Sequence, residues 1–380
     1  MKRILIVTPS LRHGGTNRSL WNFLNTKANK SYLVDILAME HYGPYQEKFK
    51  QYTLLPENQL LSSLFTPKNA TGLKKVRKIF YKALFKIVLG GNRQRLLYTV
   101  ARHIDSNKYD AVVAFQEGLA TEFVSYLSVK KRIAWVRCDY SNYLRLANRT
   151  NEAALYNRFD HIVCVSQYTA SVFESFYPHL RERIRSIYNI IDASGIVKSS
   201  RTNIRDDLFS ADHFTLVSVG RMDAVKRFAS IPHIAQQLKE KGCDFRWYII
   251  GAGGTEEQRV RHAIKECDVI DKVILLGSRD NPYPYIAAAD VLVCPSSTEA
   301  CPNVVNEAKI LHIPVVAADF ASASEYIKHN ANGVIVPLEN MANTIYLLYS
   351  DISYFETLKN GISSFIYDNN KISRELDLLF

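Results

Sequence analysis

The chain has 380 residues and a mass of 43.3 kDa, more than one ordinary domain needs and enough for two. Hydrophobic residues make up 47% of it and charged residues 22%, a composition that excludes an intrinsically disordered chain. No run of about 18 apolar residues occurs, so we expect no helix that crosses a membrane. The first apolar stretch is too short for a signal peptide. The six cysteines are scattered, which favours reduced thiols in a cytosol over disulfides or a zinc site.

The formal charge of +11 is distributed unevenly along the chain. Residues 1–200 contain 30 Lys and Arg against 14 Asp and Glu, whereas residues 201–380 contain 18 against 23. A basic half followed by an acidic half predicts two domains with different partners.

Much of the positive excess lies between Lys68 and His103, where acidic residues are absent. The ten basic residues are Lys68, Lys74, Lys75, Arg77, Lys78, Lys82, Lys86, Arg93, Arg95 and Arg102. Apolar residues from Leu73 to Val88 recur at helical spacing, which predicts an amphipathic helix. Such a helix suits an anionic membrane surface, although its apolar stripe could instead pack on its own domain. Nucleic acid is not expected as a partner, because no recognition motif accompanies the basic segment.

In the first half, continuous apolar runs alternate with helical stretches. Strands are expected at residues 3–8, 32–38, 111–115, 132–136, 161–165 and 184–188, and a helix from Ser19 to about Asn25. Apolar strands that alternate with helices predict a parallel sheet covered on both faces.

The polar, turn-rich segment after Asp192 is interpreted as an interdomain linker. Six more strands are expected at 214–219, 246–250, 272–276, 291–294, 314–318 and 333–336, with helices near 224–241, 255–267, 282–289, 301–311, 321–329 and 340–350. We therefore expect an α/β protein with two Rossmann-like, doubly wound domains, residues 1–195 and 205–352. A cleft between two such domains is a favoured site for a small molecule.

Several expected strands of the second half end in residues that suit an anionic ligand. The strand at 214–219 continues into Gly220 and Arg221, and Lys226 follows five residues later beside a helix start, where free N–H groups also favour an anion. The next strand ends in Gly251, where a small residue lets a phosphate approach or simply makes a tight turn. Arg279 lies in a third loop, which by itself has the character of an ordinary connection.

The strand at 291–294 leads into a loop and helix that carry two acids. Pro302 suits the first helical turn, so Glu299 should lie just outside the helix and Glu307 within it. Carboxylates accept hydrogen bonds from vicinal hydroxyls, as a ribose or hexose offers. The N–H groups of Asn303 and Val304 would be open to phosphate. The alternative is a pair of acids that merely favour a helix N-terminus.

Taken together, these residues resemble glycosyltransferase family 4 (group 1), retaining nucleotide-sugar enzymes with the GT-B fold. The resemblance rests on the E-x7-E pattern of Glu299 and Glu307, on the Gly220-Arg221 and Lys226 group, and on Gly14-Gly15 after the first strand. The resemblance covers nearly the whole chain. Stretches of the first half resemble members of the family that act in bacterial polysaccharide assembly. In this fold a C-terminal helix often returns to the first domain, which we expect here from about residue 353.

The resemblance implies a role for each matching residue. Arg221 and Lys226 would hold the donor diphosphate in place of a metal, and Glu307 would bind the ribose. Glu299 would lie against the donor sugar, with the backbone from Ala300 to Asn303 on its oxygens. The other donor-side residues implied are Gly14, Gly15, Gly220, Gly251, Arg279 and Val304. No metal or other cofactor is expected.

The first domain would serve the acceptor. Many relatives carry a histidine near one of its strand ends, whereas this chain has Gln116-Glu117 and Arg137 there. Glu117 is a candidate catalytic base or a satisfied structural acid, and His13 is a further candidate in the glycine loop. The sequence also departs from the family at Arg227, where a glycine is usual.

The combined prediction is a glycosyltransferase that is peripheral on the inner face of the cytoplasmic membrane. It would transfer a sugar, expected to be linked to UDP, to a lipid-linked saccharide in surface polysaccharide, O-antigen or capsule synthesis. A nucleotide-sugar epimerase or hydrolase would share the two-domain architecture, and a non-catalytic scaffold subunit is the alternative outside enzymes.

Overall fold

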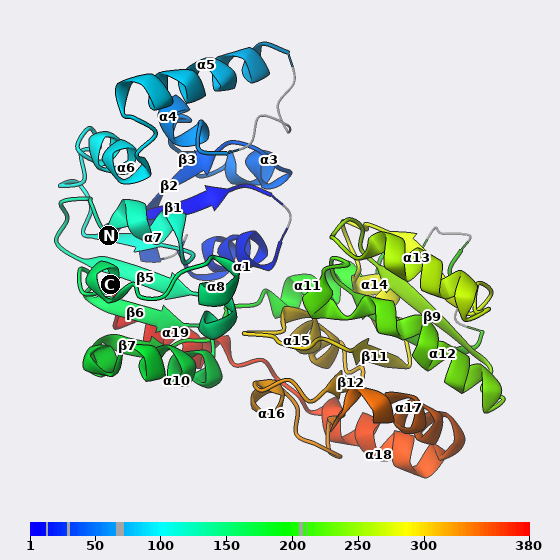
Figure 1. Ribbon diagram of the computed structural model, residues 1–380. Coiled ribbons are helices and arrows are strands. Elements are labelled where there is room, and N and C mark those ends of the chain that lie inside the picture. The colour runs from blue at the N-terminus through cyan, green and yellow to red at the C-terminus, as the bar shows by residue number, and fades with distance from the viewer. Residues whose placement is uncertain (13, 29–30, 66–71, 205–207, 211) are drawn as a thin grey trace. The chain divides into compact units, whose positions relative to one another are not determined.

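The computed structural model describes residues 1–12, 14–28, 31–65, 72–204, 208–210 and 212–380 (Figure 1). His13 and Lys68, two residues named in the sequence predictions, fall outside this set. The chain divides into two compact units, Met1–Ile191 with Asn369–Phe380, and Asp192–Asp368.

The first unit is built on a seven-stranded parallel sheet with the order β3-β2-β1-β4-β5-β6-β7. Its strands are β1 (Lys2–Ser10), β2 (Tyr32–Glu40), β3 (Thr53–Leu54), β4 (Ala111–Ala114), β5 (Arg132–Val136), β6 (His161–Cys164) and β7 (Ile184–Ser186). The longer helices are α1 (Gly15–Phe23), α5 (Gly72–Val88), α6 (Arg93–Ala101), α10 (Gln167–Phe176) and α19 (Asn369–Asp377). The shorter ones are α3 (Tyr45–Phe49), α4 (Gln59–Ser62), α7 (Leu119–Val124), α8 (Tyr140–Leu146) and α9 (Ala153–Tyr156). Sequence reasoning missed β3, because two residues give no periodicity to detect.

The second unit contains a six-stranded parallel sheet with the order β10-β9-β8-β11-β12-β13. Its strands are β8 (Phe214–Val219), β9 (Phe245–Ile250), β10 (Val273–Gly277), β11 (Val291–Cys294), β12 (Val315–Ala318) and β13 (Gly333–Val336). Its helices are α11 (Ala193–Ser200), α12 (Ile231–Glu240), α13 (Glu257–Glu266), α14 (Tyr283–Ala287), α15 (Asn303–Ile310), α16 (Ala323–Tyr326), α17 (Met341–Ser350) and α18 (Ile352–Ser363). The predicted α/β class with two parallel, doubly wound sheets is confirmed.

Each sheet reverses its strand order at one point, between β1 and β4 in the first unit and between β8 and β11 in the second. Such a reversal opens a crevice at the carboxyl ends of the strands, because the flanking connections leave toward opposite faces. Ligands of open α/β sheets bind in this crevice, so the loops after these four strands are where a site is expected.

The segment interpreted as a linker is in fact the helix α11. The Asp192 side chain accepts a hydrogen bond from the backbone N–H of Gly195 at 2.9 Å and so caps the helix, while Ile196 is buried. The polar composition of this stretch concealed a short helix whose one buried residue faces its own unit.

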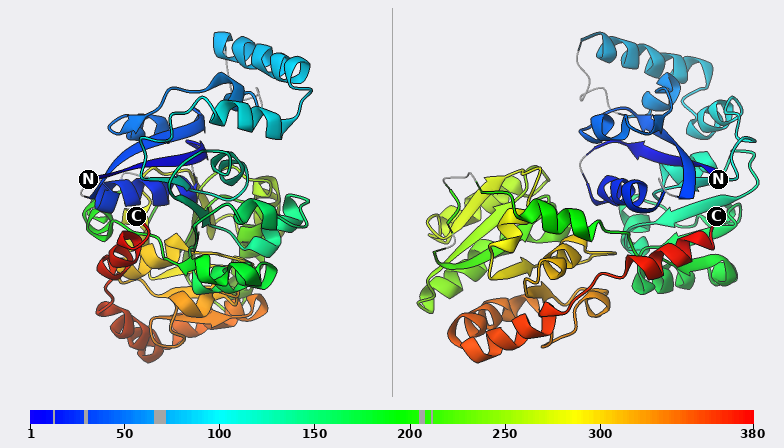
Figure 2. Two further views of the ribbon diagram at one scale, coloured as in Figure 1. Left: turned by 90° about the vertical axis from the view of Figure 1, so that its left-hand side faces the viewer. Right: turned by 180° about the vertical axis from the view of Figure 1, so that it is seen from behind.

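The chain returns to the first unit later than expected. The helix α18 stays with the second unit because it buries Leu358 and Ile362 there, and α19 from Asn369 onward belongs to the first. The Asn369 amide donates to the carbonyl of Ile191 at 2.7 Å and fixes the point of return. Both ends of the chain therefore lie in the first unit, where Lys2 contacts the Phe380 carbonyl (Figure 2).

Among the residues that the structure describes, no helix combines the length and the apolar character needed to cross a bilayer.

Candidate active site

The switch point of the second unit brings a cation and a carboxylate together from two strands. Lys226 ends the short 3-10 helix after β8, and Glu299 lies in the loop after β11. The Lys226 Nζ donates to Glu299 Oε1 at 2.5 Å, and the Ser296 hydroxyl donates to the same oxygen at 2.7 Å. Side chains from two segments that are distant in sequence thus form one polar cluster at the carboxyl end of the sheet.

The charge on Lys226 is stabilised by this cluster. Burial lowers the pKa of the Lys226 ammonium, but the Glu299 carboxylate more than offsets it, and the net pKa is raised. The positive charge of Arg221 lies close enough to Lys226 to lower its pKa in part, so the two cations are neighbours. The Arg221 guanidinium is exposed and pairs with Asp223 at 2.8 Å. Two permanent cations beside the switch point can attract a diphosphate.

The helix α15 supplies the second half of this site. Pro302 is its N-cap and Asn303 its first residue, so the N–H groups of Asn303 and Val304 begin the helix. The expected placement of Glu299 before the helix and Glu307 within it is confirmed. Glu307 is only 3% exposed. A carboxylate this deeply buried requires hydrogen-bond donors or cations around it.

One glycine of the predicted donor site, Gly251, has a packing role. A side chain on Gly251 would lie 1.9 Å from the Gly220 carbonyl oxygen, so the loops after β8 and β9 can meet only if Gly251 lacks one. The Gly220 N–H donates to the Ile250 carbonyl at 3.0 Å. Arg279, from the loop after β10, donates to the Tyr285 hydroxyl at 3.3 Å. These contacts explain the positions of all three residues, and their contact with a donor stays a prediction.

The switch point of the first unit carries the other predicted residues. Gly14 is the N-cap of α1 and Gly15 its first residue, four and five residues after the end of β1. Glu117 follows β4, is buried, and accepts the backbone N–H of Arg137 at 2.8 Å. This contact gives Glu117 a structural role of the kind that sequence reasoning left open, and its role as a base stays a prediction.

Arg137 is held more firmly than its sequence position suggested. Its guanidinium lies 3.8 Å from the Phe115 ring centroid, and it donates to the Phe115 carbonyl at 2.8 Å and to the Asn189 side chain at 2.8 Å. Asn189, like Ser296 in the second unit, was not predicted as a site residue. A single Asn or Ser gives no pattern, and only the fold shows that it contacts a charged neighbour.

The helix α5 carries its apolar residues outward, at the outer edge of the first unit beside α4 (Figure 1). Leu73 is 88% exposed, Phe80 61% and Ile87 81%, and Val76, Ile79 and Val88 are exposed as well. Within α5, all of which the structure describes, Lys78 is the one buried side chain. The alternative that this apolar stripe packs on its own domain is wrong for these six residues.

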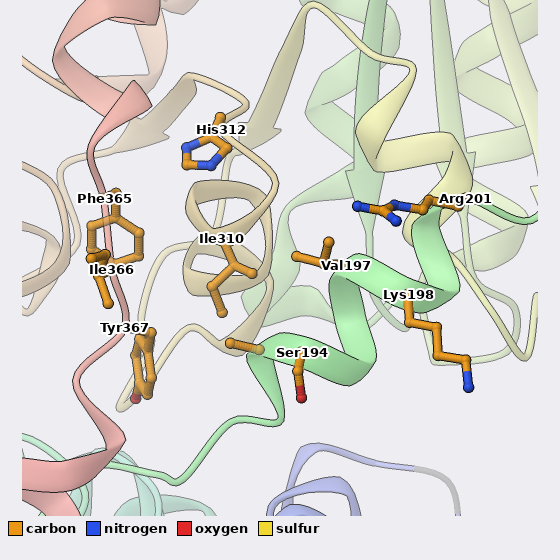
Figure 3. A pocket seen from close by; sticks show the side chains of 10 residues that line it. Ser194, Val197, Lys198, Arg201, Ile310, His312, Phe365, Ile366 and Tyr367 are labelled. Carbon is orange, nitrogen blue, oxygen red and sulfur yellow. The ribbon is translucent and has the colours of Figure 1, made fainter.

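A groove of about 520 Å³ lies at the other end of α15, away from Asn303 (Figure 3). The groove has a mostly apolar lining, formed by Val197 of α11, Ile310 at the end of α15, His312 just after it, and Phe365 and Ile366. Because it lies at the C-terminal end of α15, it is separate from the cluster of Lys226 and Glu299.

Comparisons with known proteins agree with this arrangement. The family described as "Glycosyltransferase Family 4" matches residues 13–194, and "Glycosyl transferases group 1" matches residues 200–363. The chain belongs to the family 4, group 1 glycosyltransferases. Its two units are those of the GT-B fold, as in HepE from Anabaena, solved with UDP and glucose (TM-score 0.76, 20% identity, 100% of this chain and 99% of that one).

Other relatives of this glycosyltransferase are similar over most or all of its length. TarM from S. aureus, solved as a mutant with UDP, has a TM-score of 0.74 at 14% identity, covering 100% of this chain and 99% of that one. A curated Campylobacter jejuni relative, "N-acetylgalactosamine-N,N'-diacetylbacillosaminyl-diphospho-undecaprenol 4-alpha-N-acetylgalactosaminyltransferase", is 26% identical over 99% of this chain and 98% of its own. The amylovoran biosynthesis glycosyltransferase AmsD of Erwinia amylovora is 21% identical over 84% of this chain and 81% of its own.

The departure of this glycosyltransferase from its family at Arg227 has a structural consequence. Arg227 adopts a left-handed backbone with φ of 51°, which breaks the helix expected at 224–241 into short turns and α12. Only glycine adopts this conformation without steric cost. His312, after α15, has φ of 58° and is likewise left-handed, but its ring contacts the Ile362 carbonyl at 3.0 Å.

Replacing Arg227 by glycine should therefore stabilise the enzyme. We expect the free energy of unfolding to rise by about 0.5–1 kcal/mol. The folded state gains because glycine relieves the backbone strain, and part of this gain is lost because glycine also gives the unfolded chain more conformational entropy. Thermal melting of both proteins measures the change. The matched control is Lys265→Gly, within α13, which should lower stability. A lower melting temperature for Arg227→Gly would show that the arginine side chain stabilises this turn.

Lys309 of α15 predicts a pH dependence of stability. It is buried, donates to the Tyr326 carbonyl and lies 4.0 Å from the Phe365 ring centroid, and burial lowers its pKa from 10.5 to about 8. Between those values the unfolded chain binds the extra proton, so stability should rise as the pH rises through that window. Lys309→Met should lose this rise and be more stable at pH 7, by up to about 3 kcal/mol. Unfolding of both proteins from pH 7 to 10 tests the difference; parallel curves would contradict it.

Proposed function

We propose that this glycosyltransferase transfers a sugar from a nucleoside diphosphate, UDP being the expected nucleotide, to a lipid-linked saccharide. The reaction would retain the anomeric configuration and need no metal. Its product would enter a surface polysaccharide, such as a capsule, O-antigen or other lipopolysaccharide part, built at the inner face of the cytoplasmic membrane.

The observation that carries this proposal is the cluster of Lys226, Glu299 and Ser296 at a switch point, beside Arg221 and the start of α15. A leaving diphosphate gains negative charge as the bond to the sugar breaks. Cations and helix N–H groups held ready for that charge stabilise the transition state more than the ground state. In the absence of donor, Glu299 partly neutralises Lys226, and the donor phosphates would replace or share that contact.

The remaining roles follow from the same arrangement. Glu307 would accept hydrogen bonds from the ribose, and the backbone at Asn303 and Val304 would contact phosphate or sugar oxygens. Arg221 and Lys226 would supply the charge that a divalent cation supplies in other transferases. UDP is favoured as the nucleotide because HepE and TarM were solved with it.

The acceptor side of the proposal rests on α5 and on the Campylobacter relative, whose name specifies a diphospho-undecaprenol acceptor. An exposed apolar stripe flanked by lysines lies in the plane of an anionic membrane surface, with the apolar side chains among the lipids. A lipid-linked acceptor would meet the enzyme at that surface.

The donor proposal is tested by thermal shift with UDP, GDP, ADP and a panel of their sugars, with Arg221→Ala beside the wild type. We expect stabilisation by UDP and one UDP-sugar, reduced in the variant. No stabilisation by any nucleotide would favour a scaffold subunit. Turnover of the sugar without an acceptor, at an undiminished rate, would favour an epimerase or hydrolase instead.

Charge reversal on α5 tests the membrane surface. Lys75 and Lys86 are exposed and Lys82 is half-buried, whereas Lys78 is buried and unsuitable. Changing these three to Glu should weaken binding to anionic vesicles by about 100-fold or more, at about 1 kcal/mol per charge. Lys241, Lys265 and Lys328 of the second unit, changed together to Glu, give the same net charge and should bind normally. Equal loss in both triple variants would attribute binding to net charge rather than to α5.

A further inference from the structure

We infer that Glu40 is a positioning residue that connects the membrane-facing helix α5 to the glycine loop, here residues 11–12 and 14–17, and that lipid bound to α5 orders this loop. The inference rests on the proposed membrane surface and deepens it, because it assigns a consequence inside the enzyme to contact with the lipid.

The connection begins at the buried side of α5. Lys78 is 7% exposed and forms an ion pair with Glu40, which ends β2 and is 2% exposed. At 100° per residue, Lys78 lies on nearly the opposite side of the helix from Leu73, Val76 and Phe80. When the apolar side enters a lipid surface, the Lys78 side therefore faces the body of the unit.

Glu40 also binds Arg12, which lies in the loop after β1. Its second carboxylate oxygen accepts a hydrogen bond from Arg12 Nη2 at 2.8 Å, so both of its oxygens are paired with cations. A carboxylate this buried is stable only while its cations stay in place. A displacement of α5 that weakened the Lys78 contact would leave Glu40 dependent on Arg12 alone.

The loop that receives this contact is otherwise held mainly through its backbone. The Leu11 N–H donates to the Tyr42 carbonyl at 3.2 Å, and the Leu11 carbonyl accepts the Tyr45 N–H at 3.2 Å. The Asn17 amide of α1 donates to the Arg12 carbonyl at 2.7 Å. The Arg12 guanidinium is 5.3 Å from the Tyr42 ring centroid, so the ends of β1 and β2 form one connected group.

The consequence is a link from lipid contact to the predicted donor-side glycines. Gly14 and Gly15, the N-cap and first residue of α1, lie two and three residues after Arg12, and Asn17 of α1 donates to the Arg12 carbonyl, so the position of Arg12 affects where α1 begins. The loop is held to Glu40 by Arg12, and Glu40 is held to α5 by Lys78, so the loop is ordered when α5 is fixed and less ordered when α5 moves freely. The enzyme would therefore have its glycine loop fully ordered only at the membrane, where the acceptor is.

Hydrogen exchange of the full-length protein tests this inference, with and without vesicles of phosphatidylglycerol and phosphatidylethanolamine. The variants are Lys78→Met, which breaks the pair but leaves Arg12 on Glu40, and Lys78→Arg, which keeps a cation there. The matched control is Lys75→Met, which removes one charge from an exposed position of the same helix. Thermal melting establishes that all four proteins are folded.

In the wild type and in Lys75→Met, vesicles should slow exchange in both α5 and the peptide that covers the glycine loop. In Lys78→Met, vesicles should still protect α5, but the loop peptide should gain no protection. It should exchange about tenfold faster than in the wild type, because the variant loses the charged hydrogen bond by which α5 holds Glu40, the partner of Arg12. Lys78→Arg should behave as the wild type.

Three results would overturn the inference. If vesicles protect α5 but not the loop in the wild type, the connection is absent and the membrane surface stands. If the loop of Lys78→Met is protected as in the wild type, the connection does not pass through Glu40. If vesicles protect neither segment in the wild type, the membrane surface itself is wrong and the inference fails with it.

Discussion

Replacing Lys226 by methionine should lower the rate of sugar transfer by about 100- to 1000-fold, the usual cost of removing one preorganised charge from a transition state. Methionine keeps most of the side-chain volume but cannot compensate a leaving diphosphate. The loss should appear mainly in kcat, because that charge is largest in the transition state. Initial rates over a range of donor concentrations separate kcat from KM.

The neighbouring Arg227 provides the control for this experiment. It is exposed, carries the same charge, and can be changed to glycine without disturbing its left-handed backbone. Arg227→Gly should keep the wild-type rate within about twofold, since surface changes usually have small effects. An equal loss in both variants would mean that the summed positive charge, rather than Lys226 itself, acts on the donor. Full activity in Lys226→Met would remove this lysine from the site.

Replacing Glu307 by alanine should weaken donor binding by about 10- to 100-fold, the value of a hydrogen bond to a charged group. The carboxylate is buried in the second turn of α15, behind the helix start that would contact the phosphates. Because the ribose is bound equally before and during the reaction, the loss should appear in the Kd and KM for the donor more than in kcat. Titration calorimetry with UDP measures the Kd directly.

Two further variants separate a ligand contact from a structural one. Glu307→Gln keeps the shape and part of the hydrogen bonding, so it should fall between alanine and the wild type without a change in melting temperature. Glu339→Gln, on an exposed turn of the same unit, should bind UDP as the wild type does. If Glu307→Ala binds UDP normally, the residue has only a structural role in α15.

Features that depend on neighbours in the sequence were predictable. The apolar runs predicted twelve of the strands to within two residues at each end, because a strand buried on both faces has a continuous apolar sequence. Glu299 and Glu307 could be placed on either side of a helix start because Pro302 marks that start. Lys226 follows a strand by a few residues, and the carboxyl end of a parallel strand is where such a residue meets a ligand.

Contacts between distant segments could be read only from the tertiary structure. Periodicity showed that α5 has an apolar side, but which side faces the protein depends on Glu40, 38 residues before Lys78. The helix α18 stays with the second unit because Leu358 fits that core, which its own sequence does not indicate. Glu117 and Arg137 are brought together by adjacent strands, and Arg227 is left-handed because of the turn around it. The sequence by itself determined every strand except β3, the order of the motifs and the family. The packing of distant residues decided which charges are buried and paired, because the free energy of a buried charge depends on its neighbours in space.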